Sequence, residues 1–147
     1  MISMLELQAA PPGVRLGFDL TRISAVAQSI RRFGRRFTDR LFTSGELEYA
    51  LSGSGLCAER LAARFAAKEA VIKALGLSET GLNWRDIEVT RRPDGACGLR
   101  LHGRAAQAAE QLGVQSLVLS LSHDGDYAGA VVHACLRASP DPDNDIP

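Results

Sequence analysis

The feature that most constrains the fold of this chain is the segment 64–76, RFAAKEAVIKALG. Ala, Lys, Glu and Leu are strong helix formers, and Gly76 stands where a helix commonly ends. The segment therefore predicts a helix that begins near Cys57 and runs for about five turns. Its larger apolar residues recur at helical spacing and predict one apolar stripe, made of Leu61, Phe65, Ile72 and Leu75.

Glu69 and Lys73 are four residues apart and so lie on one face of this helix, with the acid N-terminal to the base. Such a pair is commonly an exposed ion pair that contributes a few tenths of a kcal/mol. It can also belong to a functional site. The helix alone leaves both interpretations open.

The length and composition fit one ordinary domain, because 147 residues with 46% apolar content are enough to build a hydrophobic core. The 17 basic and 17 acidic residues balance, so neither nucleic acid nor a membrane surface is expected as a partner. The chain has three cysteines, Cys57, Cys97 and Cys135, and no two of them form a CxxC motif. This argues against a disulfide framework or a zinc site and favours a reducing cytoplasm as the location.

The two ends of the chain differ from the rest in composition. Residues 1–13 are expected to be a flexible leader, since they resemble neither a signal peptide nor a membrane span. Residues 138–147 combine three acids with three prolines and are expected to be a disordered tail. One domain, residues 14–137, lies between them.

Along this domain, segments whose apolar residues alternate, as in strands, are interspersed with segments whose apolar residues recur at helical spacing. This pattern predicts an α+β fold with a mainly antiparallel sheet packed against one long helix and smaller helices. Ser24 is expected to cap the first helix and Gly34 to end it, and Thr43 with Glu46 suits a capping box. The strand 127–136 includes Val131 in a run too apolar to be exposed on both sides. Further strands are expected at 14–20, 87–90, 98–102 and 116–122, and short helices at 24–33, 44–51 and 104–112.

In the first of these strands, Asp19 alternates with Phe18 and Leu20 and therefore points to the opposite face. An acid in that place is either a solvated edge residue or a site residue. His123 follows the strand 116–122, where side chains of a site often gather.

Asp19, Glu69, Lys73 and His123 together suit phosphoryl transfer. Two carboxylates supply oxygen ligands for Mg²⁺, which takes its remaining ligands from water and substrate phosphates. A lysine and a histidine can neutralise phosphate charge, which is most of what such catalysis requires. No GxxxxGK[ST] loop is present, and Ser122 lacks the motif of a hydrolase nucleophile.

Four motifs occur in order: GFDL at 17–20, RFAAKEA at 64–70, KALG at 73–76 and SLSH at 120–123. With weaker matches around them, they resemble the 4′-phosphopantetheinyl transferases over residues 14–136, and in particular the short, single-unit holo-acyl carrier protein synthases. The resemblance implies transfer of phosphopantetheine from coenzyme A to a serine of an apo acyl carrier protein, with adenosine 3′,5′-bisphosphate as the other product. A catalytically weak relative that binds the carrier or coenzyme A without transfer is the alternative.

The resemblance also implies roles for single residues. Asp19 and Glu69 match the Mg²⁺ ligands, and Glu69 or a metal-held water would take the serine proton. Lys73 matches the lysine that steadies the pyrophosphate and can protonate the leaving phosphate, and His123 matches a contact to coenzyme A phosphates. Because short members are homotrimers with sites between subunits, His123 would serve the neighbouring subunit. Two further residues are matched to coenzyme A binding: Arg64 and Lys68.

The segment 22–40 carries six arginines against a single acid, Asp39. A carrier protein presents an acidic helix beside its serine, and a basic helix is a suitable partner for it. A solvated basic face is the other interpretation. Nucleic-acid binding by these arginines is disfavoured by the sequence pI of 6.8. The positions matched to carrier contacts are Arg36, Phe37 and Arg40, with Arg22 added as a departure, since family members usually have an acid there.

Overall fold

The computed structural model describes residues 13–54, 57–78 and 81–138, so the predicted leader and tail lie almost wholly outside the described residues. Among the described residues, no helix is both long enough and apolar enough to cross a bilayer. The order of elements is β1 (Val14–Arg22), α1 (Ile23–Phe33), α2 (Arg35–Leu41), α3 (Ser44–Leu51), α4 (Ala58–Leu75), η1 (Trp84–Asp86), β2 (Ile87–Arg91), β3 (Cys97–Leu101), α5 (Gly103–Gln111), β4 (Val114–Asp124) and β5 (Tyr127–Leu136).

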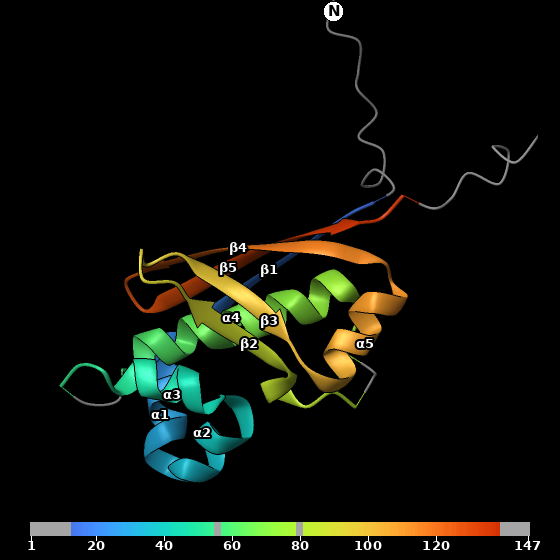
Figure 1. Cartoon of the computed structure of the whole chain (residues 1–147). Coiled ribbons are helices and arrows are strands. Elements are labelled where there is room, and N and C mark those ends of the chain that lie inside the picture. The colour runs from blue at the N-terminus through green and yellow to red at the C-terminus, as the bar shows by residue number, and fades with distance from the viewer. Residues whose placement is uncertain (1–12, 55–56, 79–80, 139–147) are drawn as a thin grey trace, which may run out of the picture.

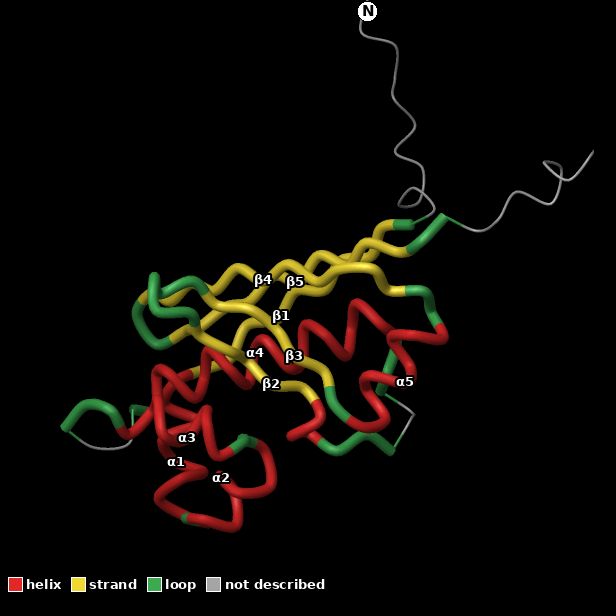
Figure 2. The backbone as a smooth tube through the Cα atoms, in the orientation of Figure 1, coloured by secondary structure: helices red, strands yellow, loops and turns green. Residues whose placement is uncertain are grey.

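The described strands form an antiparallel sheet in the order β1-β5-β4 and a separate antiparallel hairpin, β2-β3. Helix α4 runs along one face of the three-stranded sheet, with α1, α2 and α3 gathered at one end of the molecule and α5 at the other (Figure 1). The tube view shows the hairpin crossing in front of α4 (Figure 2). This arrangement confirms the predicted α+β class.

Helix α4 begins and ends as predicted, with Cys57 as its N-cap and Gly76 as a left-handed C-cap at φ 65°. The predicted single stripe is too narrow, however, because α4 is buried around most of its circumference. The sheet, the hairpin and the helices α1 and α3 all pack against α4. Small side chains make this possible, namely the buried Ala62, Ala66, Ala67, Ala70 and Ala74.

Strand β1 lies against α4 at Gly17. A Cβ atom at this glycine would stand 1.8 Å from the carbonyl oxygen of Ala70, so only glycine permits this approach. The face of β1 that carries Gly17 and Asp19 therefore points to the helix. The opposite face points outward: the exposed fractions are 64% for Leu16, 54% for Phe18 and 57% for Leu20.

The expectation that the run Ala130, Val131 and Val132 is not exposed on both sides is confirmed, because Ala130 and Val132 are buried on the inner face of the sheet. Val131 of β5 is 43% exposed and lies opposite Phe18 of β1. Val118 of β4 belongs to the same exposed face of the sheet and is 59% exposed. The outer sheet face of this chain is thus an apolar surface of Leu16, Phe18, Leu20, Val118 and Val131.

Two predicted details of the first helices are corrected. Helix α1 begins at Ile23 rather than after Ser24, and no side chain of its N-cap residue, Arg22, accepts a hydrogen bond. Helix α2 was not expected, because its seven residues carry four charges and bury only Thr38 and Leu41. Gly34 ends α1 at φ 54°, as predicted.

The predicted capping box of α3 is confirmed. Thr43 Oγ1 accepts a hydrogen bond from the Glu46 amide at 3.2 Å, and Glu46 Oε1 accepts one from the Thr43 amide at 2.9 Å. Because the Glu46 side chain is itself buried, the box also aims a carboxylate into the protein interior.

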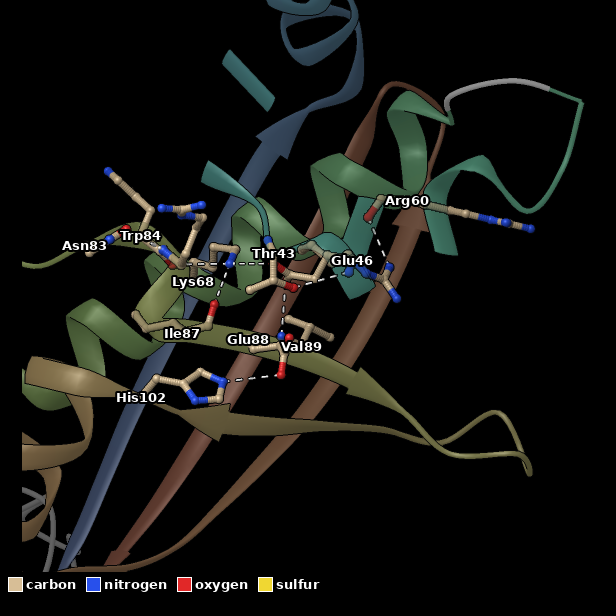
Figure 3. Close-up of polar contacts among 12 residues, drawn as sticks. Thr43, Glu46, Arg60, Lys68, Asn83, Trp84, Ile87, Glu88, Val89 and His102 are labelled. Carbon is tan, nitrogen blue, oxygen red and sulfur yellow. Dashed lines mark hydrogen bonds and ion pairs between the residues drawn. The ribbon is translucent and has the colours of Figure 1, made fainter. Parts of the chain in front are cut away.

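That carboxylate meets Lys68 of α4 in a fully buried ion pair (Figure 3). Lys68 Nζ donates to Glu46 Oε1 at 2.8 Å, to the carbonyl of Trp84 at 3.2 Å and to the carbonyl of Ile87. Glu46 Oε2 accepts from the Val89 amide at 3.0 Å. Burial lowers the pKa of Lys68, and the Glu46 carboxylate opposes that shift. The pair joins α3, α4 and β2.

Removing one member of this pair should be costly. Glu46→Ala leaves a buried ammonium without its anion, and we expect the free energy of unfolding to fall by about 3–5 kcal/mol. The double variant Glu46→Ala with Lys68→Met should lose clearly less than the two single variants together. Urea unfolding of all four proteins measures this; additive losses would contradict the coupling.

Candidate active site

Asp19 of β1 and Lys73 of α4 form an ion pair at the edge of the sheet. Lys73 Nζ donates to Asp19 Oδ1 at 2.9 Å and to the carbonyl of Phe18 at 3.0 Å. The second carboxylate oxygen, Oδ2, accepts from Thr21 Oγ1 at 3.1 Å. The Asp19 side chain is 16% exposed and that of Lys73 53%, so the pair remains open to a ligand from solution.

Glu69 lies one helical turn before Lys73 and is half-buried. Its pKa is raised, first by burial and then by the nearby Asp19 carboxylate, while Lys73 opposes the shift. The two acids are therefore close enough to repel one another. Lys73 of α4 pairs with Asp19 of β1. The simple exposed pair of Glu69 and Lys73 considered from the sequence therefore does not describe this helix face in full.

Two facing carboxylates are a suitable place for a divalent cation. A cation between Asp19 and Glu69 would offset the like-charge repulsion that, after burial, contributes to the raised pKa of Glu69. Within the described part of the chain, no group of three or more His, Cys, Asp or Glu side chains is gathered. The Asp19 and Glu69 carboxylates fit Mg²⁺, which usually takes one or two protein carboxylates and completes its shell with water and substrate phosphates.

His123 is not brought to these residues within one chain. It lies near the end of β4, which is separated from β1 by β5. Within this sheet His123 is opposite Ala128 of β5, and Ala128 is in turn opposite Thr21 of β1. Two strand spacings place the backbones of β4 and β1 about 10 Å apart. His123 Nε2 lies 3.5 Å from Glu59 Oε1 in the first turn of α4, ten residues before Glu69.

A basic cluster lies next to His123 and was only partly foreseen. Three guanidinium groups stand over the ring of Tyr49, with the carbon of Arg64 at 4.3 Å, that of Arg60 at 4.5 Å and that of Arg91 at 4.6 Å from the centroid. Together with His123 they line a cavity of about 330 Å³. The spacing of Arg60 and Arg64, one helical turn apart, was the sequence signal that could have found Arg60.

Arg64 is the most buried member of this basic cluster, at 3% exposure. Burial lowers its pKa. Its Nε atom has no hydrogen-bond partner among the described residues. A buried donor without a partner, beside two more guanidinium groups, is a suitable contact for an anion.

Lys68 is different, and its expected role as a coenzyme A contact is corrected. The side chain has no exposed surface, and its ammonium group already donates to three oxygens of the protein, those of Glu46, Trp84 and Ile87. No donor remains for a ligand. The sequence places Lys68 beside Glu69, but neighbouring helix residues point about 100° apart, so one faces the interior while the other faces the site.

The residues matched to carrier contacts gather on the helices at one end of the molecule. Arg36, Phe37 and Arg40 of α2 line a groove of about 370 Å³ together with Phe33, which is 51% exposed, and Trp84. This groove combines apolar rings with two cations. Arg22, at the end of β1, donates instead to the Tyr127 hydroxyl at 3.0 Å.

The sequence profile of the 4′-phosphopantetheinyl transferase superfamily matches residues 15–132. The chain belongs to this superfamily. The match contains Asp19, Glu69, Lys73 and His123 and so spans the whole of the site described above.

Curated and solved relatives of this phosphopantetheinyl transferase agree with the assignment. A holo-[acyl-carrier-protein] synthase of Koribacter versatilis is 46% identical over 117 residues, which cover 79% of this chain and 93% of the relative. An ACPS–CoA complex from Chronobacterium ammoniagenes has a TM-score of 0.75 at 35% identity, covering 85% of this chain and 98% of that one. Helicobacter pylori holo-[acyl-carrier-protein] synthase in complex with coenzyme A has a TM-score of 0.71 at 28% identity, with 81% and 98% covered. The predicted family, fold and enzyme class are thereby confirmed.

The raised pKa of Glu69 has a consequence for stability. A folded pKa above the unfolded value means that Glu69 destabilises the folded state once the pH rises past the ordinary glutamate value of 4.5. Without divalent metal, Glu69→Gln should therefore raise the thermal midpoint at neutral pH, and the gain should vanish below pH 4.5. The matched control is Glu110→Gln, an exposed acid of α5. A gain that is equal at both pH values would contradict the assignment.

Proposed function

We propose that this transferase moves the 4′-phosphopantetheine group of coenzyme A to a serine of an apo acyl carrier protein, with Mg²⁺ as its metal. The observation that carries the proposal is the meeting of Asp19, Glu69 and Lys73 at an open edge of the sheet. It occurs in a chain whose relatives include holo-[acyl-carrier-protein] synthases, some of them solved with coenzyme A.

In the proposed reaction the serine hydroxyl oxygen attacks the phosphorus that carries pantetheine. The bond from this phosphorus to the bridging oxygen breaks, and adenosine 3′,5′-bisphosphate leaves with the electron pair. Mg²⁺ held by Asp19 and Glu69 would supply Lewis-acid stabilisation of phosphate charge.

The residues of this chain would do the rest. Glu69, which lies beside the Asp19 carboxylate, accepts the serine proton, either directly or through a metal-held water. Lys73 exchanges its contact with Asp19 for the pyrophosphate and protonates the leaving phosphate. Its 53% exposure leaves the ammonium group free to make this change.

The basic cluster of Arg60, Arg64, Arg91 and His123 would bind the remaining phosphate of coenzyme A. The unpartnered Nε of Arg64 supports this, since a phosphate oxygen would satisfy it. Because His123 and Asp19 lie on strands separated by β5, one chain alone does not bring the basic cluster and the carboxylates together.

A homotrimer would resolve this separation. The apolar surface on the outer face of β1, β5 and β4 is of a kind that is normally covered, and closed symmetry would let it meet its own copies. His123 of one subunit would then complete the carboxylate site of the next. We further propose the reducing cytoplasm as the location, because Cys57, Cys97 and Cys135 are all free thiols.

The activity is tested by mass spectrometry. Incubation with coenzyme A, Mg²⁺ and an apo carrier should make the carrier heavier by one phosphopantetheine. Glu69→Ala should lower kcat by about a hundredfold or more, because an acid–base group is removed. Glu110→Ala should not. Carrier binding without any product, for every carrier tried, would overturn the proposal and support the binding-only alternative.

The trimer is tested by light scattering and by complementation. The wild type should have three times the mass of the 15.7 kDa chain, and Phe18→Asp should give monomers, because a charge would be buried between copies. If His123 acts on the neighbouring site, mixing inactive His123→Ala and inactive Glu69→Ala subunits should restore part of the activity. No recovery in mixed trimers would contradict a shared site.

The carrier surface is tested by charge reversal. Arg40→Glu should raise the KM for the carrier by about tenfold or more, because an acidic helix would meet a like charge. The Kd for coenzyme A should not change, since Arg40 lies in the groove with Phe37 and Trp84, away from the basic cluster. Arg104→Glu on α5, at the other end of the molecule, is the control (Figure 1). Equal effects of the two reversals would contradict a specific surface.

A further inference from the structure

Helix α1 lacks a cap from its own sequence. The first amide groups of a helix have no partner within it, and a side chain just before the helix usually accepts from them. The residue in that place here is Arg22, which has only donors in its side chain, and its guanidinium donates to Tyr127 instead.

Asp126 supplies the missing cap from the turn between β4 and β5. Its carbonyl accepts from the Ile23 amide at 2.8 Å, and its Oδ1 accepts from the Ser24 amide at 2.8 Å. Its Oδ2 accepts from the Ser24 hydroxyl. Asp126 follows Ser24 by 102 residues, so this cap ties together two distant parts of the chain.

The tie joins the proposed carrier surface to the strands of the site. Helix α1 leads through Gly34 directly into α2, which carries Arg36, Phe37 and Arg40. Asp126 directly precedes β5, which pairs with β1 along its whole length and so holds Asp19 opposite Ala130. The Asp126–Ser24 contact is therefore one of the interactions that orient the basic helices relative to Asp19, beside the direct continuation of β1 into α1 and the packing of α1 on α4.

We propose that Asp126 is a positioning residue for the transfer reaction, which holds α1 and α2 so that a docked carrier presents its serine to Asp19 and Glu69. This inference rests on the proposed function. The hydrogen bonds from Ser24 lower the pKa of Asp126, so the carboxylate is ionised at the pH of an ordinary assay.

Loss of the Asp126 side chain should weaken binding of the carrier and leave binding of coenzyme A unchanged. His123 lies only three residues before Asp126, but its place is fixed by strand pairing, with His123 opposite Ala128 and Asp124 opposite Tyr127. Backbone pairing does not require the Asp126 side chain. Arg64 belongs to α4 and also stays where it is.

Charge alone predicts the opposite result. Removing a negative charge near a basic surface should strengthen the attraction for an acidic carrier. Loss of a cap should weaken carrier binding, because α1 frays and α2 is no longer held in place. The sign of the change in KM therefore separates positioning from simple electrostatics.

The experiment compares Asp126→Ala, Asp126→Asn and Asp39→Ala with the wild type, using coenzyme A, Mg²⁺ and an apo carrier. Asp39 is an exposed acid of α2 that pairs only loosely with Arg35, so its removal changes charge without removing the cap. Asp126→Ala should raise the carrier KM about fivefold, the size of effect that loss of a helix cap brings. The Kd for coenzyme A should change less than twofold, which is well below the roughly fivefold change expected from loss of the helix cap.

Asp126→Asn should recover most of the loss, because an amide oxygen can still accept from the Ser24 amide. Hydrogen exchange should rise in residues 23–33 of Asp126→Ala and stay unchanged in β4 and β5. A carrier KM that falls, as it should in Asp39→Ala, or that does not change, would overturn the inference. Absence of transfer by the wild type would instead overturn the proposed function, so the two failures are distinguishable.

Discussion

The distance between β1 and α4 is the constraint on which the rest of the structure depends. Gly17 lets the strand backbone reach the carbonyl of Ala70, with no room for even one additional carbon atom. Asp19 is two residues further along the same face of β1, so the close contact at Gly17 places the Asp19 carboxylate within reach of Lys73. A larger residue at position 17 would separate strand and helix, and with them the two halves of the site.

A second constraint fixes how α4 is rotated about its own axis. Lys68 is held in the interior by Glu46 and by the carbonyls of Trp84 and Ile87. With Lys68 fixed, the next residue, Glu69, must face the edge of the sheet, and Lys73 one turn later faces the same way. The buried pair therefore acts on the site without touching it.

Most of the fold could be predicted from the sequence, because its signals are local. The capping box of Thr43 and Glu46, the left-handed Gly76 and the alternation around Asp19 each depend on a few neighbouring residues. The errors concern long-range contacts. Ser24 was expected as a cap, but the true cap, Asp126, lies 102 residues away.

The site was predicted to a similar degree and for similar reasons. Asp19 and Lys73 do meet, and the family motifs identified both. Lys68 was placed wrongly because its burial depends on which elements cover each side of α4, which helical spacing does not reveal. Tyr49 and Arg91 were missed because they come from α3 and β2 and meet only in the folded chain.

The packing of α4 also affects how the chain can change by mutation. In the segment 64–76 most side chains are buried, including Arg64, Lys68 and the alanines, while Glu69 and Lys73 face the carboxylate site at the edge of the sheet. A random substitution in this segment therefore alters volume more often than chemistry, and overpacking a core ordinarily costs about 1–3 kcal/mol. Most inactive variants of this helix should thus be poorly folded proteins rather than well-folded ones with a damaged site, and soluble yield would distinguish the two.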